Sequence, residues 1–445
     1  MSQSKNHNDR RRRDRRCRRS ERAQVAVESE KEWPEKLIGA KYVRLLEKEL
    51  RQLQEEPAHG NRALFLDDVF VVYLLAFFNP SIRSLRTIED LSQTKQARKH
   101  LTIDKVCKST LSDFNRVVDP ERLLPMIQAL RGNLLRKQAG RPLDETNLPE
   151  LLQHTLAVDG TFLPAVAEVA WAVANSNQAK VKRHRARLDA HLNVASWLPE
   201  TIVVPQPGES EADSAIHHIR PGHIHLYDRG YSSFALLRAH YQGVDQELTA
   251  SSHFVLRYKV AGSNSPDLEE PVACPLSEQD RAAGIVSDRQ GYFRSENASR
   301  EGVSTILLRE VVLPYEDHGV PKTLRLITNL LDVSASTIAL LYQHRWQVEL
   351  FFRWLKSFGH FGHLISHSRE GVQAHLYVSI IAVQLMYLHT GFRPSKYMFA
   401  MLSQVAAGAA TLDEILPILR ERERRKELDR LSAARRRAEK QATSR

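Results

Sequence analysis

Cysteine is scarce in this sequence, which has three in 445 residues: Cys17, Cys107 and Cys274. They lie far apart and show no paired spacing of the kind that holds a structural zinc ion. The scarcity argues against a disulfide-stapled secreted domain and against a zinc finger. It is consistent with a protein of the reducing cytoplasm.

Apolar runs long enough to span a bilayer are also lacking. The two longest, Val69–Phe78 and the stretch around Tyr377–Leu388, are too short for this and are expected to be buried helices. The amino-terminal segment is charged and has no apolar core, so we expect no secretory signal. These features predict a cytoplasmic protein without a membrane partner.

Acidic residues are fewer than basic ones: the sequence has 53 Asp and Glu residues and 64 Lys and Arg residues, which gives a formal net charge of +11. That balance favours a polyanionic partner, with nucleic acid ahead of an anionic membrane surface. A soluble protein with basic tails would show the same charge, so charge alone leaves both interpretations open. The length predicts two or three domains.

Both ends of the chain are basic, and a helical region follows the first of them. Residues 1–34 contain a dense arginine run and are expected to be a disordered tail, while 396–445 are expected to be a helical basic region. Apolar spacing predicts an all-α DNA-binding domain at 35–145. Its short helices at Leu85–Leu91 and Thr110–Val118 suggest a helix-turn-helix-like reader, although any helical bundle produces this pattern.

The pattern changes to strands alternating with helices at about residue 150. Apolar or alternating segments predict five strands, with a helix after the third and another after the fourth. The strands are expected at His154–Val158, Arg187–Val194, Thr201–Val204, His223–Tyr227 and His253–Val260, and the helices at Glu209–Ile219 and Ser233–Tyr241. This element order is typical of an α/β, ribonuclease-H-like core.

Turns rich in Gly, Ser and Pro then interrupt this alternation of strands and helices. We expect a β-rich insertion at 261–333 that splits the catalytic core into 150–260 and 334–395. Helices return after the insertion, where Ser336–Phe358 is predicted to be one long helix. Val372–Leu388 is predicted to be an apolar helix that packs against the sheet.

Two aspartates occupy corresponding places on the predicted sheet. Asp159 and Asp228 each follow a short apolar strand and each closely precede a glycine, Gly160 or Gly230. Adjacent strands would place the two carboxylates side by side, where they repel each other unless a cation joins them. Carboxylate oxygens suit Mg²⁺ or Mn²⁺, and two such ions support phosphodiester chemistry. A single aspartate at such a place more often only starts a turn.

A third carboxylate, Glu349, lies on the long predicted helix. Together with three other polar residues it falls within an arc of about 60° at the usual helical spacing; the set is Tyr342, Arg345, Glu349 and Lys356. An apolar stripe beside the arc is expected to be buried; it consists of Leu341, Val348, Phe352 and Leu355. A carboxylate among cations and a phenol suits a metal and a phosphate, although an ordinary salt-bridged helix would show the same charges.

The spacing of these polar residues resembles a known signature. Tyr342-x2-Arg345-x3-Glu349-x6-Lys356 is similar to that of the bacterial insertion-sequence DDE transposases, in the large group named for the fourth insertion sequence described. The first two acids also lie in segments that the family has, "VDGT" and "YDRGY". The resemblance covers about residues 150–390.

The resemblance implies a DNA transposase that binds terminal inverted repeats, cleaves strands in a metal-dependent reaction and joins them to target DNA. Asp159, Asp228 and Glu349 would be the catalytic residues and would coordinate two Mg²⁺ ions, with Mn²⁺ as a substitute. Family members share a retroviral-integrase-like core and act as homodimers on paired element ends. Such a protein works at the bacterial nucleoid.

The resemblance also implies a set of DNA contacts. These are Tyr342, Arg345, Trp346, Lys356, Arg229 and Tyr231. Trp346 would hold a flipped base, since an indole stacks well on bases, although a tryptophan at the edge of the core would look the same. The basic stretch Lys180–Arg187 is expected to follow the DNA backbone or to be a solvated hairpin.

The sequence departs from the family pattern at one place, which concerns the base-flipping step. Relatives place a tryptophan in the insertion to hold a flipped base during hairpin formation, and none occurs between 251 and 333. Tyr292, Phe293 and Tyr315 are candidates for its place, and the hairpin step is left open.

Two other functions fit the same residues. A ribonuclease-H-like nuclease would hydrolyse DNA without strand transfer, and joined products would distinguish the two. A catalytically silent DNA-binding protein derived from a transposase is the other alternative, and the intact set of three acids argues against it.

Overall fold

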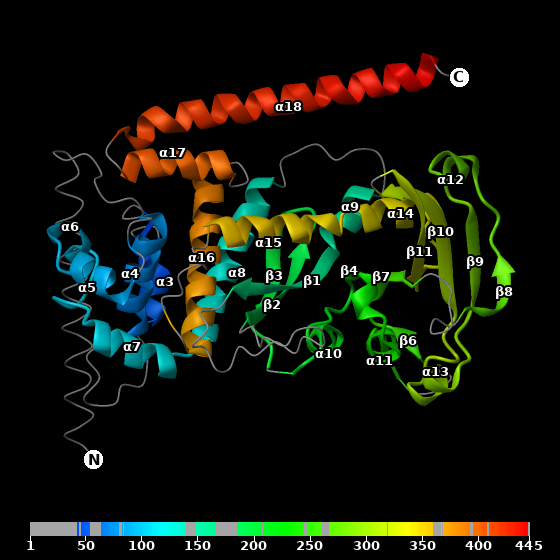
Figure 1. Cartoon of the computed structure of the whole chain (residues 1–445), viewed down its shortest axis with the longest axis horizontal. Helices are drawn as coiled ribbons and strands as arrows, with labels where there is room; N and C mark the ends of the chain where they lie inside the picture. Colours follow the sequence, from blue (N-terminus) through cyan, green and yellow to red (C-terminus); the bar gives the residue numbers. More distant parts are fainter. Residues whose placement is uncertain are drawn as a thin grey trace. The chain divides into compact units, whose positions relative to one another are not determined.

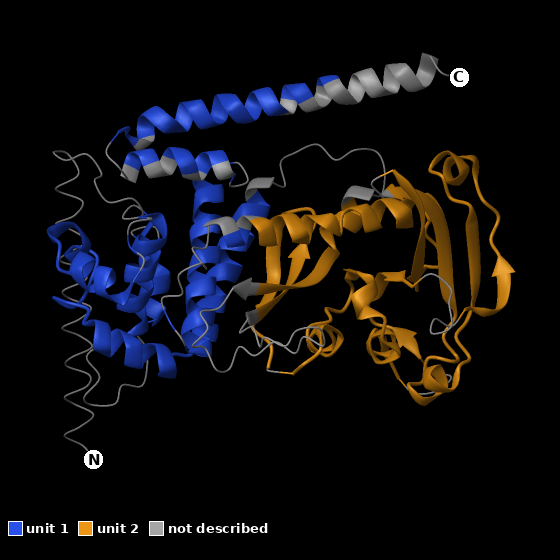
Figure 2. Cartoon of the chain, viewed as in Figure 1, with its two compact units in different colours: residues 1–139, 354–445 blue, residues 140–353 orange. Residues whose placement is uncertain are grey.

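The computed structural model of the chain forms two compact units, 1–139 with 354–445, and 140–353 (Figure 2). The residues it describes are 42–43, 46–53, 64–79, 82, 84–138, 148–164, 185–206, 208–243, 248–259, 267–317, 319–358, 366, 368–391, 395–406 and 409–443. The expected tail at 1–34 lies outside the described residues.

The described part of the first unit is helical (Figure 1). Its helices are α3 (Glu47–Leu53), α4 (Leu66–Phe78), α5 (Leu85–Ser92), α6 (Lys95–Arg98), α7 (Lys108–Val117), η2 (Pro120–Leu123), α8 (Leu124–Gln138), α16 (Arg369–Thr390), α17 (Lys396–Ala406) and α18 (Leu412–Thr443). Every residue of α4 is buried, as expected for the apolar run within it. The short helices α5 and α7 pack against each other, as two of the expected helices should.

The apolar helix α16 is part of the first unit, where it packs against α4, α7, η2 and α8. Its expected packing against the sheet stays a prediction. Gln384 donates a hydrogen bond of 3.2 Å to the carbonyl of Ile127 in α8, which fixes the pairing. By length and composition α16 would reach across a membrane, but 89% of its apolar window is buried inside the protein. A helix that is apolar on all sides gives no sequence signal for which neighbour covers it.

The second unit is built on a nine-stranded sheet in the order β3-β2-β1-β4-β7-β11-β10-β9-β8 (Figure 1). The strands are β1 (Thr155–Pro164), β2 (Arg185–Asn193), β3 (Leu198–Val203), β4 (Ile224–Tyr227), β7 (His253–Tyr258), β8 (Glu269–Ala273), β9 (Ser287–Tyr292), β10 (Leu308–Asp317) and β11 (Val320–Thr328). β1, β4 and β7 are parallel neighbours, and the remaining pairs are antiparallel. The expected α/β class is confirmed, and all five expected core strands are present.

The strands of the expected insertion continue this sheet. β11 pairs directly with β7 from Arg325↔Tyr258 to Thr328↔Val255, and β10, β9 and β8 follow outward. A turn-rich composition marks interruptions in the chain, but it does not indicate which strand edge the following strands join.

Helices and one short hairpin complete the second unit. They are α9 (Leu148–Gln153), α10 (Glu211–Ile216), η3 (Arg229–Tyr231), α11 (Phe234–Ala239), β5 (Tyr241–Gln242), β6 (Thr249–Ala250), α12 (Glu278–Ala282), α13 (Glu296–Arg300), α14 (Ala335–Gln343) and the first part of α15 (Trp346–Phe358). A buried cluster joins the sheet to α10, α11 and α13. Phe293 is at its centre, with ring centroids 5.3 Å from Tyr258 and 5.4 Å from Phe234.

The single long helix expected at Ser336–Phe358 is wrong, because the chain forms two helices there. α14 ends at Gln343 and α15 begins at Trp346. Between them the amides of His344 and Arg345 bond to carbonyls three residues back, each at 3.0 Å, which is the tighter 3₁₀ pattern. The polar arc predicted from Tyr342 to Lys356 assumed one continuous helix. Because Tyr342 and Glu349 lie on different helices, that arc does not describe their relative positions. The apolar stripe is buried as expected.

A buried ion pair anchors the start of α14. Arg309 of β10 binds both carboxylate oxygens of Asp288 in β9, at 2.8 Å and 2.6 Å. Its other terminal nitrogen donates to the carbonyls of Leu331, at 3.0 Å, and Val333, in the segment that leads into α14. One guanidinium thus joins two strands of the sheet to the helix that carries Tyr342.

Arg309→Ala is expected to lower the free energy of unfolding by about 3–5 kcal/mol, because it leaves the Asp288 carboxylate buried and unpaired. Chemical denaturation measures the change. Arg294→Ala is the matched control, since Arg294 pairs with Glu270 at the surface, where such pairs contribute about 1 kcal/mol or less. Equal stability of the two variants would contradict this role for Arg309.

Three buried histidines line the interior of the second unit. The rings of His191, His225 and His240 form a chain, with centroids 5.9 Å and 5.2 Å apart. His240 bonds to Ser252 at 2.7 Å, and Tyr227 bonds to its other ring nitrogen at 3.2 Å. Burial lowers the pKa of His225 to about 3, and holds the pKa values of His191 and His240 well below 6.5.

These histidines predict a loss of stability in mild acid. They stay neutral in the fold, while the unfolded chain takes up protons below about pH 6.5. Above that pH the free energy of unfolding is therefore unaffected by these groups. As the pH decreases toward 3, it falls by up to about 1.4 kcal/mol per pH unit for each histidine. Denaturation curves at pH 7.5, 6 and 5 test this. His225→Gln should flatten the dependence, and an equally steep curve in that variant would count against it.

Candidate active site

Asp159 and Asp228 lie on neighbouring parallel strands in the same register. β1 and β4 pair from Thr155↔Ile224 to Ala157↔Leu226, and each aspartate lies two residues beyond the last pair. β1 itself continues to Pro164 along β2, so Asp159 lies within a strand rather than at its end. The parallel register brings the two aspartates to the same edge of the β1–β4 pair.

Local backbone bonds hold both aspartates. One oxygen of Asp159 accepts a hydrogen bond of 2.9 Å from the amide of Gly160. Asp228 caps η3, where it accepts a bond of 2.7 Å from the amide of Arg229. Burial raises the pKa of Asp159 to about 7; Arg345 opposes this shift, while Glu211 and Glu349 add to it. The Asp159 carboxyl is therefore in a site where further negative charge is unfavourable.

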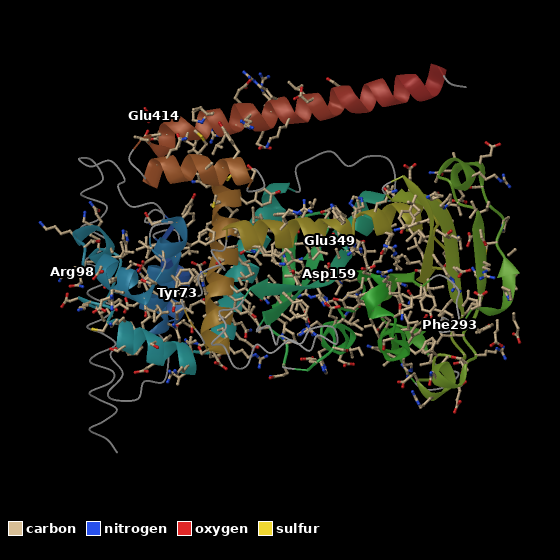
Figure 3. All side chains as sticks on the ribbon, in the orientation of Figure 1. Tyr73, Arg98, Asp159, Phe293, Glu349 and Glu414 are labelled. Atoms are coloured by element: carbon tan, nitrogen blue, oxygen red, sulfur yellow. The ribbon has the colours of Figure 1, made fainter. Side chains whose placement is uncertain are left out.

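Arg345 connects Asp159 to Glu349, the third expected acid. These two acids are labelled in Figure 3. One terminal nitrogen of its guanidinium lies 3.7 Å from an oxygen of Asp159, and the other donates a hydrogen bond to Glu349. Arg345 is only 8% exposed, so little water competes for these contacts. The structure thus brings together acids from β1 and α15 through the arginine that separates the two helices.

The residues fit a divalent cation by their chemistry, although not in their present side-chain positions. Within the described residues, no three Asp, Glu, His or Cys side chains are arranged to hold a metal ion. Arg345 neutralises Asp159 and Glu349 where a cation would otherwise do so. The buried hydroxyl of Tyr231 also has no hydrogen-bond partner among the described residues. Hard oxygen donors of this kind are what Mg²⁺ and Mn²⁺ require.

Beside Arg345 an aromatic pocket of about 280 Å³ opens in the second unit. Tyr342 and Trp346 line it from α14 and α15, and Tyr315 lines it from β10. Arg257 of β7 donates a 2.7 Å hydrogen bond to the Tyr315 hydroxyl, which fixes that ring. Trp346 is 50% exposed, so its indole is open to a ligand. Burial raises the pKa of Tyr342, so its phenol stays protonated.

The other expected DNA contacts are in different environments. Arg229 and Lys356 are exposed. Tyr231 is 2% exposed, so its phenol reaches no surface phosphate without a rearrangement, and its contact with DNA stays a prediction. Among the candidates for the missing tryptophan, Phe293 is fully buried in the core and is wrong for that place, whereas Tyr315 lines the pocket.

The basic stretch Lys180–Arg187 is only partly described. Arg187 is directed inward, with bonds of 2.9 Å and 3.0 Å to the two oxygens of Asp189. It also donates to the carbonyls of Glu209 and Ser210. Residues 180–184 lie outside the described part. For Arg187 the expected role on the DNA backbone is wrong, because its guanidinium is used within the protein.

A fourth acid, Glu211, was not found by sequence reasoning. A Cβ atom at Gly160 would lie 2.5 Å from one oxygen of the Glu211 carboxylate, and one at Gly230 would lie 3.5 Å from the other. The glycine that follows each aspartate was the available signal, since it leaves room for a neighbouring group.

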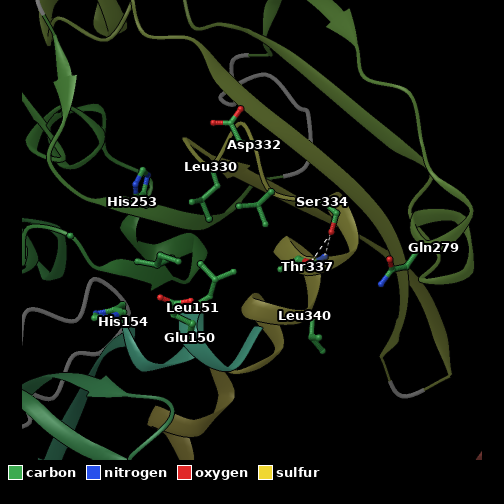
Figure 4. A pocket seen from close by; sticks show the side chains of 13 residues that line it. Glu150, Leu151, His154, His253, Gln279, Leu330, Asp332, Ser334, Thr337 and Leu340 are labelled. Atoms are coloured by element: carbon green, nitrogen blue, oxygen red, sulfur yellow. Dashed lines mark hydrogen bonds between the residues drawn. The ribbon is translucent and has the colours of Figure 1, made fainter. Parts of the chain in front are cut away.

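Another pocket of the second unit, of about 670 Å³, is shown in Figure 4, and none of these acids lines it. Side chains from α9, from the start of β7 and from α14 line it, among them Glu150, His253 and Thr337. His154 and Gly222 precede β1 and β4, whereas the aspartates follow the paired part of those strands. Size alone therefore does not locate the chemistry in this protein.

Comparison with known proteins agrees with this geometry. Residues 151–385 match a family model described as "Transposase DDE domain". A probable transposase for insertion sequence element IS5377 of Geobacillus stearothermophilus is 40% identical over 106 residues, which are 24% of this chain and 27% of that protein. The putative transposase y4zB of Sinorhizobium fredii is 24% identical over 230 residues, 52% of this chain and 59% of that protein. The matches thus span between about a quarter and three fifths of these curated relatives.

Among solved structures, the chain is similar to a cryo-EM structure of the piggyBac transposase synaptic complex with hairpin DNA. The TM-score is 0.38 at 10% sequence identity, and the match covers 85% of this chain and 81% of that one. No residue assignment is drawn from a likeness at this level.

Proposed function

Because the chain belongs to the family of proteins with a transposase DDE domain, which residues 151–385 match, we propose that it is a DNA transposase. Asp159, Asp228 and Glu349 are its catalytic acids. The observation that carries the proposal is the common register of the two aspartates on β1 and β4, with Glu349 joined to Asp159 through Arg345. The spacing from Tyr342 to Lys356 supports membership of the insertion-sequence group with this signature.

The catalytic domain is ribonuclease-H-like. Three antiparallel strands, β3, β2 and β1, followed by β4 and β7 parallel to β1, support this assignment. The core comprises 150–260 and 334–395, and the insertion, 261–333, extends its sheet. The helical domain at 35–145 binds DNA, with the basic region 396–445 as an additional contact.

The three acids hold two Mg²⁺ ions, which Mn²⁺ can replace. When bound, these ions neutralise the charge that develops on the reacting phosphate and align the attacking and leaving oxygens. The carboxylates of Asp159 and Asp228 supply oxygens from one sheet edge, and Glu349 supplies them from α15. Arg345 must release Glu349 for this, and it is then free to bind a phosphate of the DNA end.

The reaction has two steps, and in each of them an oxygen attacks a phosphodiester. Water attacks the phosphorus at the element end, the bond to the 3′ oxygen breaks, and that oxygen leaves as a 3′-hydroxyl after it takes up a proton. The hydroxyl then attacks a phosphodiester of target DNA, where one P–O bond forms as another breaks. Tyr342, Arg345 and Lys356 hold the phosphates near the terminal nucleotide, with Arg229 and Tyr231 beside Asp228.

The helical unit reads the terminal inverted repeats. α7 follows α5 and α6 with its Lys108, Ser109 and Arg116 exposed, a surface that fits a DNA groove and its phosphates. Two copies of the chain pair the two element ends as a homodimer. The protein acts in the bacterial cytoplasm at the nucleoid, where its substrate is.

Asp159→Asn tests the catalytic assignment. With DNA that carries the flanking inverted repeats and Mg²⁺, the unmodified chain should give both cleaved and joined products, whereas the variant should lose at least a hundredfold in both. Asp213→Asn, an exposed acid of α10, is the control and should keep full activity. Cleavage without joining by the unmodified chain would identify a nuclease instead. Full cleavage by Asp159→Asn would overturn the site.

The aromatic pocket holds a flipped base between Trp346 and Tyr315. Stacking of one base on an aromatic ring contributes about 1–3 kcal/mol, so Trp346→Ala should weaken binding of a cleaved end by that amount. Stacking on an aromatic ring quenches 2-aminopurine, so this base at the terminal nucleotide should be brighter in the complexes with Trp346→Ala or Tyr315→Ala than in the complex with the unmodified chain. Leu350→Ala, an exposed apolar residue on α15, is the control. The same signal from all variants would place the base elsewhere.

A further inference from the structure

Glu211 lies between the backbone segments that follow the two catalytic aspartates. Its carboxylate is close enough to Gly160 that a Cβ there would meet it at 2.5 Å, and its other oxygen would be 3.5 Å from a Cβ at Gly230. A Cβ at position 160 would also lie 2.9 Å from an oxygen of Asp189, so a larger residue there requires these carboxylates to move. One side chain thus lies beside both aspartate motifs.

The chain fixes the backbone before Glu211 and leaves its carboxylate without a partner. Arg187 bonds to the carbonyls of Glu209 and Ser210, while the same guanidinium binds Asp189. Neither oxygen of Glu211 has a hydrogen-bond or ion-pair partner within the part of the chain that the structure describes. Burial raises the pKa of Glu211; Asp189 and Asp228 add to the shift, and Arg187 opposes it. A carboxylate held in this way is unfavourable for the fold unless a cation or a proton joins it.

A buried hydroxyl gives independent evidence of a ligand at this place. Tyr231 is 2% exposed, and within the described residues its hydroxyl has no hydrogen-bond partner. It directly follows Gly230, where an added Cβ would lie 3.5 Å from Glu211, and burial, followed by the Glu211 and Asp159 carboxylates, raises its pKa. A buried hydroxyl left unbonded costs about 1–3 kcal/mol, so it points to a group that binds there.

Helix capping does not account for Glu211. Ser210 caps α10 through the amide of Asp213 at 3.1 Å, and donates to the Asp213 carboxylate at 2.6 Å. Asp213 is exposed and already supplies a negative charge to the first turn. Glu211, in contrast, is directed toward the aspartate motifs. The two acids of one helix turn therefore have separate roles, and Asp213 offers a matched control.

We propose that Glu211 is a fourth acidic residue of the divalent-cation site formed by Asp159 and Asp228, and that the Tyr231 hydroxyl donates a hydrogen bond into that site. The inference rests on the proposed function, because it requires that these aspartates hold a cation. Glu211 adds a hard oxygen and a negative charge beside the segments that follow the two aspartates. It is a ligand of the cation or of water bound to it.

The first test measures binding of Mn²⁺ alone to the full chain without DNA, by titration calorimetry. Glu211→Gln is expected to weaken the affinity about 10- to 100-fold, the usual effect of losing a supporting group at a metal site. Asp213→Asn removes the same charge from the same helix turn and should bind as the unmodified chain does. Equal affinity of the two variants would overturn the role of Glu211.

Asp159→Asn separates this inference from the proposed function. If Asp159→Asn loses Mn²⁺ binding while Glu211→Gln keeps it, only the fourth acid is wrong. If Asp159→Asn binds Mn²⁺ as the unmodified chain does, the proposed metal centre fails as well. Thermal melting without metal checks that each variant folds, and removal of the Glu211 charge should leave the melting temperature equal or higher.

A second test moves the carboxylate without removing it. Gly160→Ala should displace the flexible end of Glu211 and weaken Mn²⁺ binding, whereas Gly230→Ala, at an ordinary contact distance, should not. In a double-mutant cycle, the losses from Gly160→Ala and Glu211→Gln should be less than additive, because both act on Glu211, even though the added Cβ also meets Asp189. Additive losses, or equal effects of the two glycine substitutions, would contradict the proposal.

Discussion

Repulsion between carboxylates is the constraint around which the second unit is arranged. Asp159, Asp228, Glu349 and Glu211 come from four different elements; among the described residues, Arg187 opposes the raised pKa of Glu211, and Arg345 contacts both Asp159 and Glu349. Buried like charges are tolerated only when something compensates them. Arg345 occupies the turn between α14 and α15. Its position therefore couples the electrostatics of the acids to the geometry of the helix that carries Glu349.

Much of the core was predictable because its signals are local. Short apolar strands that end near an aspartate and a glycine indicate parallel strands with acids at one edge, and the register of Asp159 and Asp228 agrees with this. The break at His344–Arg345 was not predictable in the same way. It contains neither glycine nor proline, and it results from amides that bond three residues back instead of four.

The features that sequence reasoning missed depend on contacts distant in the chain. Glu211 gains its environment from Gly160 and Gly230, 51 and 19 residues away, and no spacing rule links them. Arg187 was read as part of a basic surface, but its guanidinium is used to hold Asp189 and the start of α10. The apolar α16 packs against α4, α7, η2 and α8, and a helix that is buried on all sides gives no sequence signal for which neighbours cover it.

The continuous sheet has a consequence for any attempt to shorten the protein. β11 covers the edge of β7, which in turn pairs with β4, the strand that leads to Asp228. Excision of 261–333 would remove that cover and expose a row of unpaired amides and carbonyls along β7. An uncovered edge of this kind is a template for self-association and aggregation. A minimal catalytic fragment must therefore retain β10 and β11, or replace them with another strand along the same edge.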